Sequence, residues 1–465
     1  MRKALLLAIA MILLPINGYT TPAFGNSTLE DCRKIGNNAS GSVTRFEDGG
    51  HIEDWSNFLK PQGKLRTLII PIDFSDAPHV TSLGSIKEFG DKIAREFTKL
   101  SNSKLNLEIS ITSNWIRMPR DGKYYVSANW TEKINDALDA ANSEVDFSKF
   151  ELILIKVDEK NSPIDSAGAL PMWGEHLHDG IKVLRGAFLG NDFWTKQGQG
   201  VQVAVHEIGH VFGLPDLYQR NSNGQFPVGI YDLMSTFRLQ YELNLLGWNK
   251  WKLGWLDESK LKCISIKNPS LLAFPRDKTN WDPVFIPYED RVLGIEMWSN
   301  AGSSNEIAAL IYEVTPKTYV WASNRESGAV SPIQLLRPQN SNRLTAGEPE
   351  INGGAKFLPG DSVQHFGVDF RFMEGGKDFY YVSITPAGQE TVEIPLSDKQ
   401  VEGLSSESST KDNGSQTVAG KSNPEPKPKV RTVVSKVTIT CAKGKLSKKV
   451  TAVKPLCPSG YKKKK

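Results

Sequence analysis

The segment from His206 to Asp216, HEIGHVFGLPD, constrains the fold of this chain more than any other part of its sequence. His206 and His210 are four residues apart, so on a helix their imidazoles project from one face, about a turn apart. The opposite face would carry an apolar stripe at helical spacing, formed by Val201, Val205, Ile208 and Phe212. We therefore expect a helix over residues 201–212 that is anchored to a hydrophobic core.

The residues after this helix complete a candidate metal site. Gly213 suits a left-handed helix end and Pro215 cannot continue a helix, so the chain turns and delivers Asp216 just past the turn. Two imidazoles at this spacing and a carboxylate suit Zn²⁺, and three protein ligands leave a position for water. Glu207 could accept a proton from that water. The spacing predicts His206, His210 and Asp216 as zinc ligands and Glu207 as general base.

The pattern HExxHxxGxPDxY, from His206 to Tyr218, resembles the immune inhibitor A family of secreted bacterial metallopeptidases, which belong with the metzincins. The resemblance implies that Asp216 is the third ligand and that the turn from Tyr231 to Ser235 places Met234 beneath the metal without ligating it. Met234 has a second interpretation, as a buried methionine that fills a gap in the core.

The resemblance extends more weakly over residues 64–385 and has two departures. The arm before the first strand is too short for the pro-segment that the family leads us to expect. A tyrosine that could switch on and off the metal does not follow Met234 closely, since Phe237 stands nearby and Tyr241 further on.

The implied function is that of a secreted zinc endopeptidase, a hydrolase that cleaves protein or peptide substrates with zinc-activated water. Substrate would lie extended along an edge strand, for which Lys182 to Leu189 is the candidate. The alternative is a non-catalytic envelope-binding protein built on a peptidase scaffold. The presence of Glu207 favours the enzyme, because a binding module needs no general base.

Apolar runs and turn signals predict an α+β fold. We expect a metzincin-like catalytic domain, with a mixed twisted sheet and an active-site helix, then a β-sandwich-like subdomain and a short basic tail. The expected boundaries are 1–26 for a signal peptide, 27–61 for an N-terminal arm, 62–259 for the catalytic domain, 260–396 for the β-rich subdomain, 397–430 for a flexible linker and 431–465 for the tail. Trp248, Trp251 and Trp255 recur at helical spacing, which predicts core packing on a second long helix.

The first residues have the composition of an export signal. Arg2 and Lys3 precede an apolar run from Ala4 to Ile16, which is too short for a permanent membrane-spanning helix. An uncleaved membrane anchor is the alternative. We expect a secreted protein without a transmembrane segment in its mature form, either extracellular or retained at the bacterial cell surface.

Four cysteines in an exported chain favour disulfides. Cys441 and Cys457 lie close together near the end and are expected to pair, which leaves Cys32 with Cys263. In the alternative, Cys32 is a thiolate latch on zinc in a latent form, which would leave Cys263 unpaired.

The net charge of +4 hides an asymmetry. Eleven of the 56 Lys and Arg residues lie between Arg431 and the C-terminus, with no Asp or Glu among them, so the remainder carries 45 basic against 52 acidic residues, a net −7. The tail could bind an anionic cell-envelope polymer or lipid, or remain a solvated charged end. Nucleic acid is not expected, because little aromatic interleaving is present beyond Tyr461.

Two weaker candidate sites lie upstream of the motif. His176 and His178 could form a second metal site, although two residues apart on a loop they are typical of surface histidines that could line the cleft. Asn191 and Asp192 could hold structural Ca²⁺, but a polar turn is the simpler interpretation, because the sequence has no calcium-loop signature there.

Overall fold

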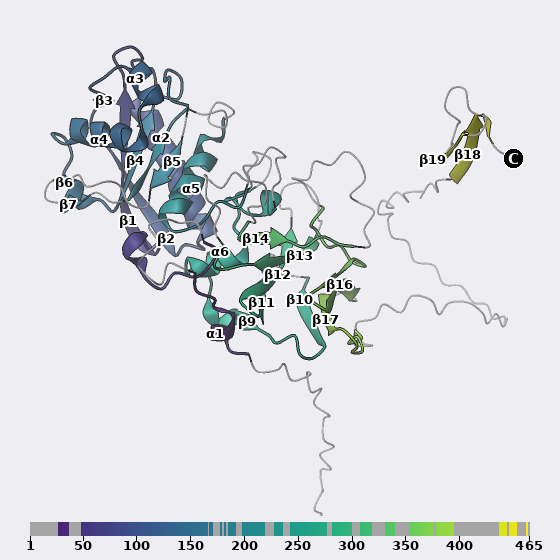
Figure 1. Cartoon of the computed structure of the whole chain (residues 1–465). Helices are drawn as coiled ribbons and strands as arrows, with labels where there is room; N and C mark the ends of the chain where they lie inside the picture. The colour runs from purple at the N-terminus through teal and green to yellow at the C-terminus, as the bar shows by residue number, and fades with distance from the viewer. Residues whose placement is uncertain are drawn as a thin grey trace, which may run out of the picture. The chain divides into compact units, whose positions relative to one another are not determined.

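The structure is a computed structural model, and it describes residues 27–36, 48–165, 167–170, 177–178, 181–182, 185–191, 198–218, 227–235, 242–276, 281–299, 307–318, 331–339, 354–375, 378–394, 437–443, 446–452 and 462–463 (Figure 1). The chain forms two compact units, Met1–Val401 and Glu402–Lys465. Several sheets and a few helices make up the fold, so the predicted α+β class is confirmed. Among the described residues, no helix has the length and apolarity needed to cross a membrane.

The first sheet of the larger unit is mostly parallel. Its strand order is β2-β1-β4-β8-β5, and β3 also pairs with β1. The strands are β1 (Gly63–Asp73), β2 (Leu105–Ile111), β3 (Ile116–Arg117), β4 (Leu152–Val157), β5 (Gly168–Leu170) and β8 (Gly186–Leu189). The pairs β1–β2, β1–β4 and β4–β8 are parallel, whereas β5 runs antiparallel to β8. Among the described strands, β5 ends this order on the side of β8.

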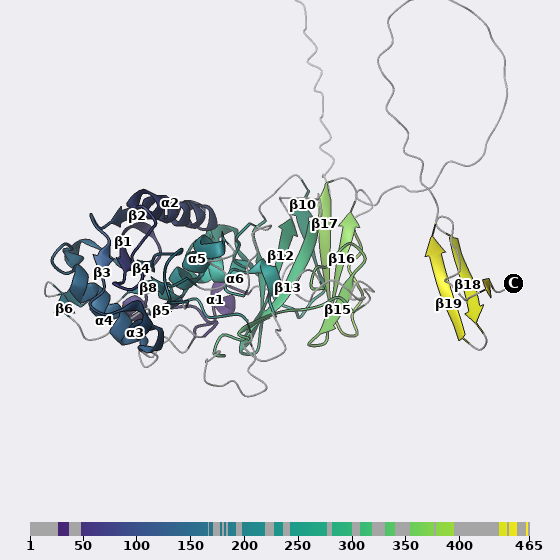
Figure 2. The ribbon, with the colours of Figure 1, turned by 90° about the horizontal axis from the view of Figure 1, so that it is seen from above.

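Both faces of this sheet are buried under helices, which is why its central strands read as continuous apolar runs. Along β1, Leu65 and Ile69 face one hydrophobic cluster while Leu68 and Ile70 face another. The first cluster includes residues of α2 (Leu83–Leu100) and α5 (Gly200–Val211), and the second those of α3 (Gly122–Ser127) and α4 (Trp130–Ala141). Figure 2 shows α2 and α4 on opposite sides of the strands.

The prediction that Lys182 to Leu189 forms the edge strand is wrong. Residues Ile181–Lys182 form β7, which pairs with β6 (Leu177–His178) in a separate two-stranded sheet. Residues Gly186–Leu189 form β8, which lies between β4 and β5 and has partners on both sides. The sequence could not show this, because an inner and an edge strand of this length have the same apolar composition.

The residues after position 261 form two further sheets that pack around a common core. The five-stranded sheet has the order β14-β13-β12-β11-β9 and the four-stranded sheet β10-β17-β16-β15. Their strands are β9 (Lys262–Cys263), β10 (Ser270–Pro275), β11 (Val284–Tyr288), β12 (Arg291–Ser299), β13 (Ile307–Val314), β14 (Ile333–Leu335), β15 (Ser362–His365), β16 (Val368–Gly375) and β17 (Phe379–Pro386). Ile295, Ile311, Phe370 and Val382 are among the residues of this shared core.

The other face of the five-stranded sheet is also buried. Phe285, Leu310 and Tyr312 belong to the same hydrophobic cluster as α2 and α5. Residues on both sides of position 260 therefore share one core, and the β-rich part supports the segments that lie beside α5.

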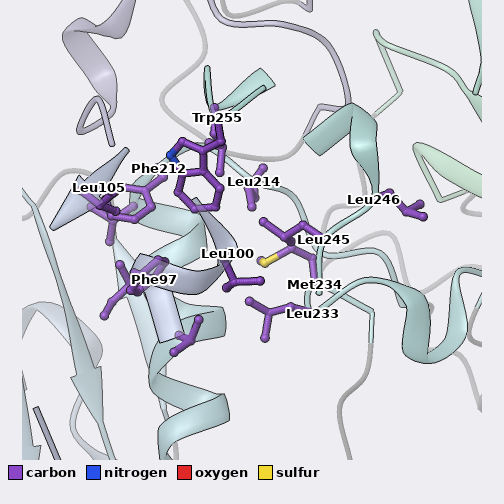
Figure 3. Packing of buried hydrophobic residues seen from close by; sticks show 14 of the residues in the cluster. Phe97, Leu100, Leu105, Phe212, Leu214, Leu233, Met234, Leu245, Leu246 and Trp255 are labelled. Carbon is purple, nitrogen blue, oxygen red and sulfur yellow. The ribbon is translucent and has the colours of Figure 1, made fainter. Parts of the chain in front are cut away.

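Helix α6 (Gly247–Lys252) links these two parts. Trp248, Trp251 and Trp255 are all fully buried, in agreement with the predicted core packing. The predicted long helix is wrong, because α6 has six residues and Gly254 then adopts a φ of +73° that reverses the chain before Trp255. Figure 3 shows Trp255 beside Phe97 and Phe212, and the rings of Phe97 and Trp255 pack edge to face.

The N-terminal arm is joined to this core at several points. Cys32, at the end of α1 (Leu29–Cys32), forms a disulfide with Cys263 of β9, as expected from the sequence. The indole of Trp248 donates to the carbonyl of Gly49 (2.7 Å), and that of Trp255 to the carbonyl of Pro61 (2.8 Å). The described residues of the larger unit also form the 3-10 turns η2 (Trp55–Asn57), η3 (Phe147–Lys149), η5 (Gly229–Tyr231) and η6 (Glu258–Lys260).

The smaller unit contains a three-stranded sheet, formed by β18 (Val437–Lys443), β19 (Leu446–Ala452) and β20 (Lys462–Lys463) in the order β19-β18-β20. Cys441 lies in β18, but Cys457 lies outside the described residues, as do the proposed signal peptide at 1–26 and the proposed linker at 397–430.

Candidate metal centre

Helix α5 carries both histidines on a buried element. Val205, Ile208 and Phe212 pack in the core, with the Phe212 ring edge to face against Phe97 of α2 at 5.4 Å between centroids. His206 and His210 are themselves buried, because the residues that follow α5 fold back over them. Burial on a packed helix fixes the direction of both imidazoles.

The end of α5 is built for a sharp turn. The N–H of Gly213 donates to the carbonyl of His210 (2.9 Å) and that of Leu214 to the carbonyl of Gly209 (3.0 Å), which is the Schellman pattern. Gly213 has a φ of +89°, a left-handed conformation that favours glycine. A Cβ at this position would lie 2.5 Å from Ile52 and 3.2 Å from Phe58, so the arm packs directly against the turn.

The turn brings Asp216 to the two histidines. One carboxylate oxygen of Asp216 (Oδ1) lies 3.2 Å from Nε2 of His206 and 3.3 Å from Nε2 of His210. A tetrahedral zinc ion with ligand bonds of about 2.0–2.1 Å places its ligand atoms about 3.3 Å apart. These three residues are the one such group of three His, Cys, Asp or Glu side chains within the described part of the chain.

The hydrogen bonds of the Nδ1 atoms determine what the Nε2 atoms of the two histidines can bind. Nδ1 of His206 contacts the carbonyl of Leu233 (3.1 Å), and Nδ1 of His210 the carbonyl of Leu214 (2.8 Å). A carbonyl only accepts, so both Nδ1 atoms must carry a proton and donate it. With a proton on Nδ1, each imidazole can present the lone pair of Nε2 beside the carboxylate of Asp216. The three atoms could then bind one cation together, and the residues present fit a tetrahedral metal ion.

The electrostatics of the protein alone point in the same direction. Burial opposes the charged imidazolium of His206, but its hydrogen bond with Asp216 and the charges of Asp216 and Glu207 outweigh that effect and raise its pKa to about 9. Burial would likewise raise the pKa of Asp216, but the two histidines lower it well below its usual range. The site thus stabilises positive charge at the point where the three side chains meet.

Glu207 and Tyr218 flank the two histidines. Glu207 is partly exposed, although the residues on either side of it, His206 and Ile208, are buried. The ring of Tyr218 lies at 29° to that of His206, with 6.1 Å between centroids. A partly exposed carboxylate beside a buried ligand can exchange protons with water while it remains close to the metal position.

Met234 lies in the core below α5. Its side chain is fully buried, and a Cβ added to Gly209 would lie 2.8 Å from its sulfur. Gly209 lies between His206 and His210 in the sequence, and its lack of a side chain allows the sulfur of Met234 to approach the helix there. Figure 3 shows Met234 among Leu233 and Leu245. The carbonyl of Met234 accepts the N–H of Leu217 (2.8 Å), which ties this turn to the residue after Asp216.

Sequence reasoning missed two buried carboxylates near this turn. Asp232 accepts the N–H of Met234 (2.8 Å) and that of Leu246 (2.9 Å). Glu296 on β12 accepts the N–H of Gly247 (2.6 Å). Aspartate side chains in turns often accept the backbone N–H two residues later, and this local pattern could have identified Asp232. Glu296 contacts an N–H that is distant in the sequence, so no local pattern indicates its role.

The remaining candidates have different outcomes. The disulfide of Cys32 with Cys263 excludes the thiolate latch, because the sulfur of Cys32 is already bonded. His176 and Asp192 lie outside the described residues, and of His178 only the backbone in β6 is described. Asn191 is buried next to the end of β8. Phe237 and Tyr241 also lie outside the described residues.

Comparison of the chain with protein-family models, with curated proteins and with solved structures gave no match.

Proposed function

We propose that this chain is a zinc-dependent endopeptidase of the immune inhibitor A type, with His206, His210 and Asp216 as ligands and Glu207 as general base. One observation carries the proposal. Both histidines donate from Nδ1 to backbone carbonyls and turn Nε2 toward the same Asp216 oxygen, at 3.2 and 3.3 Å. Combined with a partly exposed glutamate at position 207, this is the arrangement that metal-assisted hydrolysis needs.

The residues of this chain would divide the reaction between them. When bound, zinc supplies a Lewis acid that polarises the scissile carbonyl and lowers the pKa of water. Glu207 accepts the proton of the attacking water and passes it to the leaving amine. Asp216 contributes more negative charge than a third histidine would, which weakens the Lewis acid and leaves a larger share of the activation to Glu207.

Two features of the fold support the proposal of a metzincin-like catalytic domain. Its sheet is parallel except for β5, and α5 crosses the face of that sheet beside β5 and β8. Because β5 ends the described strand order, it replaces residues 182–189 as the candidate strand along which an extended peptide would lie.

Export and a surface partner are part of the same proposal. The Cys32–Cys263 disulfide favours an oxidising compartment outside the cytoplasm. The eleven basic residues from Arg431 onward would hold the enzyme to an anionic envelope polymer or lipid. Salt-sensitive sedimentation with vesicles of anionic lipid, lost when residues 431–465 are deleted, would test this attachment. Binding that is independent of the tail would contradict it.

Casein cleavage by purified wild-type protein and by Glu207→Ala tests the activity. We expect one zinc per chain in both proteins and cleavage at least about 100-fold slower in the variant, because general acid–base catalysis contributes about 10²–10⁴-fold. Glu88→Ala on α2, which removes an exposed carboxylate paired with Lys92, is the matched control and should cleave normally. Wild-type protein that binds zinc but cleaves nothing would favour the non-catalytic alternative. Equal cleavage by Glu207→Ala would exclude the proposed mechanism.

A further inference from the structure

The carboxylate of Asp232 occupies a central position in the turn that contains Met234. It is fully buried and accepts three N–H groups, from Met234 (2.8 Å), from Leu246 at the start of α6 (2.9 Å) and from the side chain of Asn249 (2.9 Å). It therefore connects the turn to α6, and through α6 to the β-rich part of the unit.

One of these three donors, the N–H of Met234, belongs to a peptide group that also contacts the candidate zinc ligand His206. The N–H of Met234 and the carbonyl of Leu233 are the two ends of a single planar peptide unit. The carboxylate of Asp232 holds the N–H end, and Nδ1 of His206 donates to the carbonyl end (3.1 Å). Because a peptide is rigid and polarisable, a carboxylate at one end both fixes its plane and increases the negative charge on the oxygen at the other end.

We infer that Asp232 is a positioning residue for the metal centre, which acts through the Leu233–Met234 peptide to hold His206 with Nδ1 protonated and Nε2 directed at the metal. The inference rests on the proposed zinc site. The described hydrogen bonds of Asp232 go to Met234, Leu246 and Asn249, so its carboxylate acts on His206 through the peptide and not by direct contact.

A purely structural role for Asp232 is the competing explanation, since the same carboxylate also caps α6. Glu296 makes the two roles separable. It is also a buried carboxylate, carried by β12, and it accepts the N–H of Gly247 at the start of α6 (2.6 Å) and the hydroxyl of Tyr312 (3.1 Å). Its described hydrogen bonds do not reach the Leu233–Met234 peptide. Glu296→Gln therefore perturbs α6 without touching this peptide.

The test compares Asp232→Asn with Glu296→Gln in the full-length chain. Zinc affinity is measured by competition with a chromophoric chelator, and the ligand geometry by the absorption spectrum of the Co²⁺-substituted protein. We expect Asp232→Asn to bind zinc about 10-fold more weakly, since outer partners of metal ligands contribute about 10–100-fold, and to change the Co²⁺ spectrum. Glu296→Gln should change the urea unfolding midpoint but leave zinc affinity within about twofold.

The imidazole N–H protons give a second measurement that is independent of metal affinity. In wild type, the Nδ1–H protons of His206 and His210 should both exchange slowly with solvent, because each donates to a buried carbonyl. Asp232→Asn should accelerate exchange at His206 alone, with His210, bonded to Leu214, as the internal control. Unchanged zinc affinity, Co²⁺ spectrum and His206 exchange in this variant would overturn the inference. Wild-type protein that binds neither zinc nor Co²⁺ would instead refute the proposed function on which it rests.

Discussion

Gly213 lets the chain turn from α5 to Asp216, because it adopts a φ of +89° where a side chain would also collide with Ile52. We expect Gly213→Ala to lower the free energy of unfolding by about 1–3 kcal/mol, which is the range for a strained backbone residue. We also expect it to weaken zinc binding about 10-fold, because Asp216 follows three residues later. Urea unfolding and chelator competition measure the two effects.

Gly360 provides the control for backbone strain alone. Its φ is +96°, but an added Cβ would meet no atom within 4 Å, and it lies outside the metal site. Gly360→Ala should therefore destabilise the chain without changing zinc affinity. If Gly213→Ala binds zinc as tightly as Gly360→Ala, the turn does not set the position of Asp216.

The grouping of His206, His210 and Asp216 could be predicted because its geometry is local. A helical period of four places His206 and His210 together, and a glycine and a proline specify the turn to Asp216. The groups that orient the histidines could not be predicted. The partner of His206 is the carbonyl of Leu233, 27 residues away, and a backbone carbonyl has no signature in the sequence.

Two buried carboxylates accept backbone N–H groups at the start of α6: Asp232 accepts that of Leu246, and Glu296 that of Gly247. Burial raises the pKa of Glu296 to about 7, although the N–H of Gly247, the charge of Lys250 and the hydroxyl of Tyr312 oppose the shift. Burial also raises the pKa of Asp232, to about 6. In the folded chain Glu296 therefore keeps its proton between about pH 4 and pH 7, where the unfolded chain has lost it.

The folded state thus binds more protons than the unfolded state in this window, so the stability that depends on Glu296 falls as the pH rises. Glu296→Gln cannot ionise. We therefore expect its unfolding free energy to increase relative to wild type from pH 5 to pH 8, by at most about 1.4 kcal/mol per pH unit. Urea unfolding of both proteins with a chelator present measures the difference, and parallel pH profiles would show that Glu296 does not titrate in this range.

The sequence predicted the presence of long strands better than the pairing of strands or the length of a helix. The apolar runs from Leu65 to Phe74 and from Phe150 to Val157 predict buried strands, and the structure has β1 (Gly63–Asp73) and β4 (Leu152–Val157) there. These runs are continuous because both faces of the sheet are buried. The place of β8 between β4 and β5 depends on pairing with residues distant in sequence, which a run of apolar residues does not specify. The length of α6 was overestimated because Gly254 ends the helical pattern that the tryptophans continue.

At the scale of the whole molecule, one disulfide joins the N-terminal arm to the β-rich part. Cys32 and Cys263 are 231 residues apart, so their bond closes a long loop and restricts the unfolded chain. We expect the double variant Cys32→Ser, Cys263→Ser to lose about 2–4 kcal/mol of unfolding free energy, measured with urea. The matched double variant Cys441→Ser, Cys457→Ser should leave the unfolding of the larger unit unchanged. Equal effects of the two double variants would contradict this account.

The arm also reaches the candidate metal centre directly. The N–H of Leu59 donates to the carbonyl of Val211 (3.0 Å) at the end of α5, and Phe58 packs against the Gly213 turn. The arm is thus part of the support for α5, and the sequence alone could not show this, because residues 27–61 have no regular period.

We propose that one zinc ion, bound by His206, His210 and Asp216, makes this chain a peptidase. The most direct measurement treats the purified protein with a chelator and then titrates zinc while casein hydrolysis is recorded. We expect no hydrolysis without zinc, and a rate of hydrolysis that rises linearly with added zinc until one zinc per chain is bound. Hydrolysis that persists without zinc, or that is absent at every ratio of zinc to protein, would contradict the proposal.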